Sequence, residues 1–167
     1  DQTFLRSECS SQEAIARFLY PACTLDTSFD GDGYATYGDL GGDNSGEGAL
    51  VWAFAIDNDG KYVIGGKIDL AWLVMRVHGP TGALDTSFGG SGWLSYHFND
   101  TRNARAEVRD LVTLPNLFGP DPIIAVGFAR LGQNVDFDVA VAMLTGSGGF
   151  LAGFGGGDGI VLTDFGT

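Results

Sequence analysis

The stretch LDTSFDGDG at residues 25–33 recurs as LDTSFGGSG at residues 84–92 and, more weakly, as LAGFGGGDG at residues 151–159. The first two copies begin 59 residues apart and the last two begin 67 residues apart. A period of about 60 residues is typical of repeat proteins, in which each unit buries its apolar face against its neighbours. The sequence therefore predicts two whole repeats, at residues 25–83 and 84–150, and the start of a third at residues 151–167.

Each repeat contains apolar segments of strand length that are separated by turn residues. Asp59-Gly60 is a hairpin signal inside the first repeat, and a longer loop at residues 115–122 replaces it in the second. Four antiparallel strands in about 60 residues is the size of one propeller blade. The near-continuous apolar runs fit strands that are buried on both faces. The predicted strands are residues 34–37, 49–56, 61–66 and 70–77, then 93–98, 106–114, 123–128 and 137–144.

The start of the third repeat adds a ninth strand at residues 160–165. The predicted fold is therefore all-β, with two propeller-like four-stranded antiparallel blades and an extra C-terminal strand. Two blades cannot close a ring, because closed propellers have about four to eight. Two arrangements would cover the free faces. One is a two-sheet sandwich within one monomer, and the other is assembly, in which the odd strand completes a blade of another chain.

Residues 1–24 precede the repeats and have a different pattern. Ser10 and Glu13 have the spacing of a helix capping box, and an apolar stripe at helical spacing follows them. Cys9 and Cys23, the two cysteines of the chain, flank this predicted helix. A disulfide between them would close a short loop, and it would indicate an oxidising compartment. The alternative is a pair of free buried thiols.

The composition is that of a globular, acidic protein. Hydrophobic residues make up 44% of the chain, and the net charge is −12. This charge argues against nucleic acid as a partner, because phosphates need a basic surface. The chain contains no apolar run long enough to span a membrane. It begins with Asp1 rather than Met, which we interpret as a mature end left by removal of a leader or as an artificial boundary.

The repeated phrase, followed by a strand and by the segment NDGKYVIGG at residues 58–66, resembles the delta-60 repeat family of bacteria. The resemblance covers roughly residues 25–166, and it is weaker in the second repeat, where LFGPD at residues 117–121 stands in place of the Asp-Gly-Lys turn. It implies a propeller-like fold in a secreted or cell-surface protein. It implies no particular activity.

Aspartates in and after the first phrase are a candidate calcium site. Asp30, Asp32 and Asp39 are close in sequence, and calcium prefers several oxygen ligands on a flexible loop. The second phrase has Gly89 and Ser91 at the positions of Asp30 and Asp32. In the alternative interpretation, Asp26 and Asp85 hold Asx turns, and Phe29, Phe88 and Phe154 pack between neighbouring blades. No other cofactor is predicted.

No cluster of residues predicts an active site. The two histidines, His78 and His97, lie in different repeats, and the Gly-x-Ser-x-Gly elbow of many hydrolases is absent from the sequence. We therefore expect a non-enzymatic structural or accessory subunit that is extracellular, on the cell surface or periplasmic. Its partners would be copies of itself or subunits of a larger complex, and the alternative is a surface module that binds carbohydrate or calcium. The candidate partner-binding residues are Trp93, Tyr96, Ile160, Leu162 and Phe165.

Overall fold

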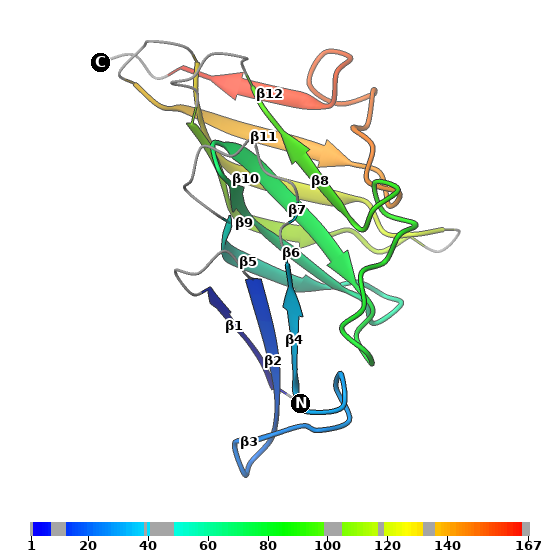
Figure 1. The fold of residues 1–167 in the computed structure, drawn as a ribbon. Coiled ribbons are helices and arrows are strands. Elements are labelled where there is room, and N and C mark those ends of the chain that lie inside the picture. Colours follow the sequence, from blue (N-terminus) through cyan, green and yellow to red (C-terminus); the bar gives the residue numbers. More distant parts are fainter. Residues whose placement is uncertain are drawn as a thin grey trace.

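The computed structural model describes residues 2–7, 13–38, 40, 49–98, 105–116, 119–131 and 136–164. These residues form twelve strands and contain no helix. The strands make three antiparallel sheets, here named A, B and C, with β1 and β12 at opposite ends of the molecule (Figure 1). The all-β prediction is thus confirmed, but the chain has three sheets rather than two sheets and an odd strand. No described helix has the length and apolar character needed to cross a membrane.

Sheet A is formed by the N-terminal segment and the first phrase. Its strands are β1 (Gln2–Ser7), β2 (Glu13–Leu19), β3 (Thr24–Leu25) and β4 (Tyr34–Tyr37). β2 is central, with β1 along one side and with β3 and β4 end to end along the other.

The helix predicted between Cys9 and Cys23 is wrong, because its described part contains strand β2. Apolar residues at positions 14, 15, 18 and 19 fit one stripe of a helix, but they equally fit a strand that has apolar residues on both faces. Ile15 is 2% exposed and joins the core toward sheet B, whereas Ala14 and Ala16 point the other way and are half-buried. Pairing with β1 and β4 provides hydrogen-bond partners for the backbone N–H and C=O groups of β2 on both sides. The segment therefore does not need the internal hydrogen bonds of a helix.

The predicted disulfide is not supported either. Cys23 is an exposed free thiol at the turn after β2, where its φ of 52° is left-handed. Cys9 lies outside the described residues. The structure therefore gives no disulfide from which to infer an oxidising compartment.

Sheets B and C are four-stranded meanders in chain order. Sheet B contains β5 (Ala49–Ile56), β6 (Tyr62–Ile68), β7 (Ala71–Val77) and β8 (Trp93–Tyr96). Sheet C contains β9 (Arg105–Thr113), β10 (Ile123–Arg130), β11 (Asp138–Leu144) and β12 (Ile160–Thr163).

The repeated phrase lies immediately before the last strand of each sheet, which is β4, β8 or β12. The sequence period and the sheets are therefore offset by one strand. This offset corrects the expectation for the C-terminal segment, since β12 pairs with β11 and completes sheet C. It is not a ninth strand left over from two blades.

The three sheets are stacked face to face, and sheet B lies between A and C (Figure 1). One core cluster joins A to B, and a second joins B to C. Every residue of β6 and β7 is buried, as the apolar runs of these strands predicted.

Sheets B and C each have a β-bulge at the equivalent place in their first strand. Trp52 in β5 and Arg109 in β9 are the extra residues at this point, and the Arg109 guanidinium lies 4.7 Å from the centre of the Trp52 ring. Gly66 and Gly127 face the two bulges, and a Cβ on either would come within 1.9 Å of a backbone oxygen of the bulged strand. The bulge thus explains why a glycine is needed in the middle of β6 and of β10.

Candidate functional site

The aspartate of the repeated phrase folds its own turn. In the first copy, the Asp26 carboxylate oxygen Oδ1 accepts hydrogen bonds from the Ser28 backbone N–H (3.0 Å) and hydroxyl (2.6 Å). In the second copy, Asp85 accepts the same two bonds from Ser87 at 3.1 and 2.6 Å. The Asx turns predicted at Asp26 and Asp85 are therefore confirmed.

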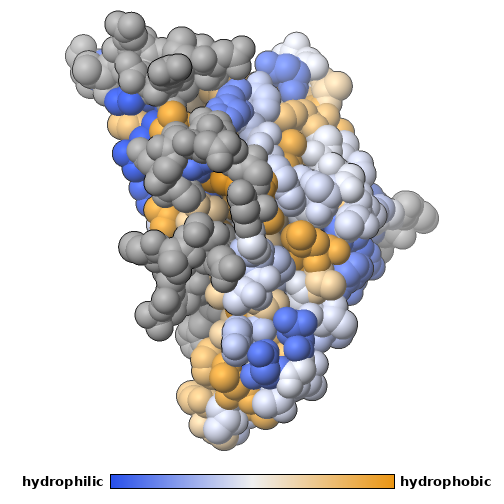
Figure 2. Space-filling view, in the orientation of Figure 1, coloured by the Kyte–Doolittle hydropathy of each residue, from blue (hydrophilic) through white to orange (hydrophobic). Residues whose placement is uncertain are grey.

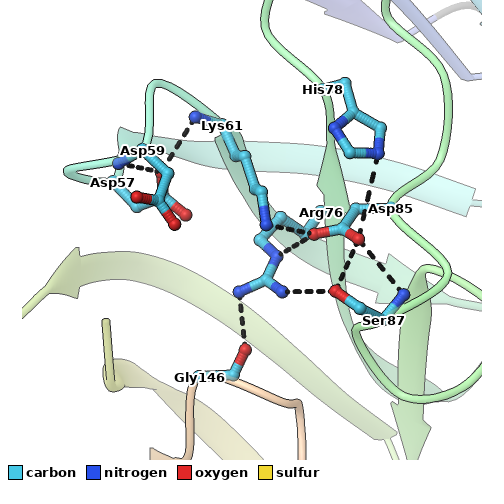
Figure 3. A network of polar contacts seen from close by, with 8 residues as sticks. All are labelled: Asp57, Asp59, Lys61, Arg76, His78, Asp85, Ser87 and Gly146. Carbon is cyan, nitrogen blue, oxygen red and sulfur yellow. Dashed lines mark hydrogen bonds and ion pairs between the residues drawn. The ribbon is translucent and has the colours of Figure 1, made fainter. Parts of the chain in front are cut away.

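A buried arginine from the preceding strand binds the same turn. Arg76 in β7 is 1% exposed, and its Nε donates to the other oxygen of Asp85 at 2.8 Å (Figure 3). Its Nη2 donates to the Ser87 hydroxyl at 3.2 Å, and its Nη1 donates to the backbone carbonyl of Gly146 at 2.6 Å. Gly146 belongs to the turn that follows β11, so Arg76 ties sheet B to sheet C.

The first repeat contains the same arrangement one sheet earlier. Arg17 in β2 donates to Asp26 at 2.9 Å, to the Ser28 hydroxyl at 2.8 Å and to the carbonyl of Gly79 at 2.9 Å. Gly79 lies in the turn after β7, so Arg17 ties sheet A to sheet B. We call each set, Arg17 with Asp26 and Ser28 or Arg76 with Asp85 and Ser87, an Arg–Asp–Ser clamp.

A phenylalanine completes each clamp. Phe29 and Phe88 are 0% exposed, and they lie 5.1 and 5.0 Å below the guanidinium groups of Arg17 and Arg76. Each ring also packs on a glycine of the next sheet, Gly82 or Gly148, where a Cβ would come within 2.9 or 3.1 Å of the ring. The prediction that these two phenylalanines pack between sheets is confirmed. Their charged neighbours are all paired, with Asp26, Arg76 and Asp85 buried and Arg17 half-buried, so we interpret the clamps as structural elements.

The second clamp has one additional cation, Lys61, and a histidine close by. The Lys61 ammonium lies 2.9 Å from the Asp85 carboxylate, and His78 Nε2 lies 3.9 Å from it (Figure 3). Burial by itself would raise the pKa of Asp85. Hydrogen bonds from Ser87 and Lys61, together with the charge of Arg76, outweigh burial and hold that pKa well below its ordinary range.

Sequence reasoning missed both arginines, although the sequence holds a signal for them. Arg17 precedes Asp26 by nine residues, and Arg76 precedes Asp85 by nine. These nine residues span the end of one strand, the turn that follows it and the first two residues of the phrase.

The third copy has no clamp. The backbone bonds from Met143 N–H to Gly159 and from Leu151 N–H to Met143 repeat those of Arg76 and Asp85, so Met143 and Leu151 occupy the clamp positions. Phe150 then matches Leu84, because both form the isolated bridge to the preceding strand. Phe154, the third phenylalanine of the series, is half-exposed rather than buried. No described element covers this side of sheet C.

The outer face of sheet C, which points away from sheet B, carries an apolar patch, and the exposed Asp110 in β9 borders this patch directly opposite Val126. Val126 in β10 is directly opposite Val141 in β11, which is opposite Val161 in β12. Large hydrophobic residues of this face are strongly exposed: Val112 is 50%, Val126 37%, Val139 38% and Val161 37% exposed. A smaller apolar surface lies at the opposite end of the molecule, over β3 and the end of β2, where Leu19 and Leu25 are about 40% exposed (Figure 2).

The predicted partner-binding residues are not gathered on one surface. Ile160 is 8% exposed and belongs to the core between B and C, whereas Leu162 is 39% exposed. Tyr96 is half-buried and makes edge contacts with Phe98 and Phe150, and Trp93 is half-buried on the edge strand β8. Phe165 lies outside the described residues.

The predicted calcium ligands are only partly described. Asp30 and Asp32 are exposed residues of the turn before β4, and the Asp32 carboxylate accepts a hydrogen bond from the Tyr34 N–H at 3.1 Å. Asp39 lies outside the described residues. Among the side chains that the structure does describe, no three metal-ligating groups lie together. The calcium site therefore stays a prediction.

Comparison with known proteins gave no match to a family model, a curated protein or a solved structure.

Proposed function

We propose that this chain is a non-enzymatic structural or accessory subunit that binds another protein chain through the outer face of sheet C. The observation that carries the proposal is the exposure of Val112, Val126, Val139 and Val161 together on that face. Contiguous exposed apolar surface of this kind is typical of protein–protein contacts. A shallow hollow of about 180 Å³, lined by Asp110 as well as by Val112 and Val126, offers space for a partner side chain.

The equivalent face of sheet B supports this proposal, because sheet C covers it within the chain. In sheet B, Val74 is paired with Leu94, and Val74 is 2% exposed beneath sheet C. In sheet C, Val141 is paired with Val161 at the equivalent positions, and Val161 is 37% exposed. The outer face of sheet C thus has the character of a face that is normally packed against another sheet.

The expected occupant is a second copy of the chain, with the same face of sheet C packed against it about a two-fold axis. Two-fold pairs of identical surfaces are the commonest oligomers. Continuation with another clamped sheet is disfavoured, because Met143 and Leu151 replace the arginine and the aspartate. β12 is already paired with β11, so we assign the contact to the face of the sheet rather than to an exchanged strand.

We also propose that the chain is an exported, propeller-like protein of the delta-60 type. This proposal is supported by the equivalent structure of the first two copies of the phrase. Asp26 and Asp85 each form an Asx turn, and each accepts a hydrogen bond from an arginine of the preceding strand. A repeated phrase with one conserved structural role is what a stacked repeat architecture requires.

Light scattering coupled to size-exclusion chromatography tests the contact. The wild-type chain is expected to approach twice its 17.5 kDa mass as its concentration rises. Val126→Lys combined with Val139→Lys should hold it at the monomer mass, because a lysine ammonium is costly to bury in an apolar contact. Ile56→Lys, at a 54% exposed position of sheet B, is the matched control and should leave association unchanged. A wild-type chain that stays monomeric throughout contradicts the proposal.

A further inference from the structure

A groove opens at the junction of sheets A and B, on the side of β4 and β8. Its volume is about 610 Å³, which lies within the usual range of small-molecule sites. Its lining comes from the turn before β4, from β4 itself, from the turn and phrase after β7, and from β8. The residues used below are Asp30, Tyr37, Leu84 and Trp93.

The junction of sheets B and C shows what this groove would be if it were filled. There, Phe150 occupies the position of Leu84, and its ring packs edge-on against Tyr96 with 4.7 Å between ring centres. Tyr96 itself occupies the position of Tyr37. At the A–B junction the smaller Leu84 leaves that volume open, and Tyr37 instead donates its hydroxyl to the carbonyl of Gly82 at 2.6 Å.

The polar lining of the groove also differs between the two junctions. Asp30 has a left-handed φ of 51°, and the residue that follows the second buried phenylalanine is Gly89, with a φ of 61°. A carboxylate is therefore present at a backbone position that favours glycine. Burial, aided by the charge of Asp30, raises the pKa of Tyr37, so its hydroxyl stays neutral.

These groups match an uncharged, hydroxyl-rich ligand. The Asp30 carboxylate can accept hydrogen bonds from two neighbouring hydroxyls. The indole of Trp93 offers an apolar surface to the C–H face of a sugar ring. The lining residues that the structure describes include an aspartate and no cation, which disfavours anionic ligands.

We propose that the groove between sheets A and B binds a neutral saccharide, with Asp30 hydrogen-bonding its hydroxyls and Trp93 packing on its ring. This binding is separate from the contact at sheet C and goes beyond it. The second junction provides the variants that test the site. Asp30→Gly installs the residue found at position 89, and Leu84→Phe installs the one found at position 150.

Isothermal titration with neutral oligosaccharides of glucose, galactose, mannose and N-acetylglucosamine is the direct test. At least one probe is expected to saturate the wild-type chain, and Asp30→Gly and Leu84→Phe should each weaken its binding at least about tenfold. Asp30→Gly should still fold, because glycine accepts the left-handed φ at no cost. Asp32→Asn is the matched control for lost charge, since Asp32 is not among the residues that line the groove, and it should change binding less than twofold.

Two results would overturn the proposal. One is that no neutral probe binds, or that binding persists in both variants. The other is that a lysine-containing peptide, and no saccharide, binds in a way that Asp30→Gly abolishes, which would make the site an ammonium site. Circular dichroism and a urea titration of each variant separate lost binding from lost folding. The monomer–dimer equilibrium of Asp30→Gly should match that of the wild type, so failure here is distinct from failure of the contact at sheet C.

Discussion

The A–B and B–C junctions are held by the same clamp but differ beside it. At both, an arginine bonds an aspartate, a serine and a carbonyl of the next sheet, and a phenylalanine is buried beneath it. Beside the clamp, Phe150 fills the B–C junction, whereas Leu84 leaves the A–B junction open. The clamp therefore fixes how the sheets stack, whereas the space beside it differs between the two junctions.

The largest expected effect is loss of the clamp arginine. Arg76→Met should lower the free energy of unfolding by about 3–5 kcal/mol, because it leaves the Asp85 carboxylate buried among fewer partners. Arg17→Met should cost less, about 1–3 kcal/mol, since the Arg17 and Asp26 side chains are each 11% exposed. Urea titrations of the two variants measure the difference. Equal costs would mean that the two clamps do not differ in burial as described.

The buried phenylalanines test whether the two junctions are packed equally well. Phe29→Ala and Phe88→Ala should cost similar amounts, about 3–5 kcal/mol each, because both rings are fully buried between sheets. Phe154→Ala is the matched control at the half-exposed third copy and should cost about 1 kcal/mol. A large cost at Phe154 would indicate that something covers it in solution.

Acid should weaken both clamps, and the B–C clamp more. Hydrogen bonds from the Ser28 side chain are the main cause of the lowered pKa of Asp26, and Asp85 has Lys61 in addition to its arginine and serine. A folded-state pKa below the unfolded value of about 3.9 means that each ionised carboxylate stabilises the fold above that pH. This stability is lost as the pH falls toward the folded-state pKa.

The test is the urea midpoint measured from pH 6 down to pH 2. The urea midpoint of the wild-type chain should decrease once the pH is below about 4. Asp85→Asn should start lower and fall less steeply, and Asp26→Asn should show a weaker form of the same change. A wild-type midpoint that is flat across this range would contradict the direction of both pKa shifts.

The smallest effects are expected in the open groove. Leu84→Phe and Asp30→Gly should each change the free energy of unfolding by less than about 1 kcal/mol, since the first fills existing space and the second relieves a left-handed φ. A urea titration is sufficient to measure both. A cost above about 2 kcal/mol for Leu84→Phe would mean that the groove is not open in solution.

The β structure and the local turns could be predicted from the sequence, because they depend on patterns within a few residues. Asp26 and Asp85 each form the Asx turn that their spacing to a serine indicates. The apolar runs at β6 and β7 are buried on both faces as predicted.

Features that depend on contacts between distant segments could not be predicted. An apolar pattern at residues 14–19 fits a helix until β1 and β4 are known to pair with that segment. The offset between repeat and sheet follows from the pairing of β8 with β7 across the phrase. The sequence aligns Leu151 of the third copy with Leu84, but the bridge to Leu144 shows that Phe150 has the position of Leu84.

The central claim is that the outer face of sheet C is a protein contact, and the most direct test measures the solvent accessibility of that face. Valine and isoleucine methyl signals can be recorded by NMR with a soluble nitroxide, over a dilution series of the wild-type chain. The methyls of Val126 and Val139 should be broadened by the nitroxide at low concentration and protected at high concentration, while the exposed Ile56 methyl stays broadened throughout. Broadening of Val126 and Val139 at every concentration would contradict the claim that this face is a protein contact.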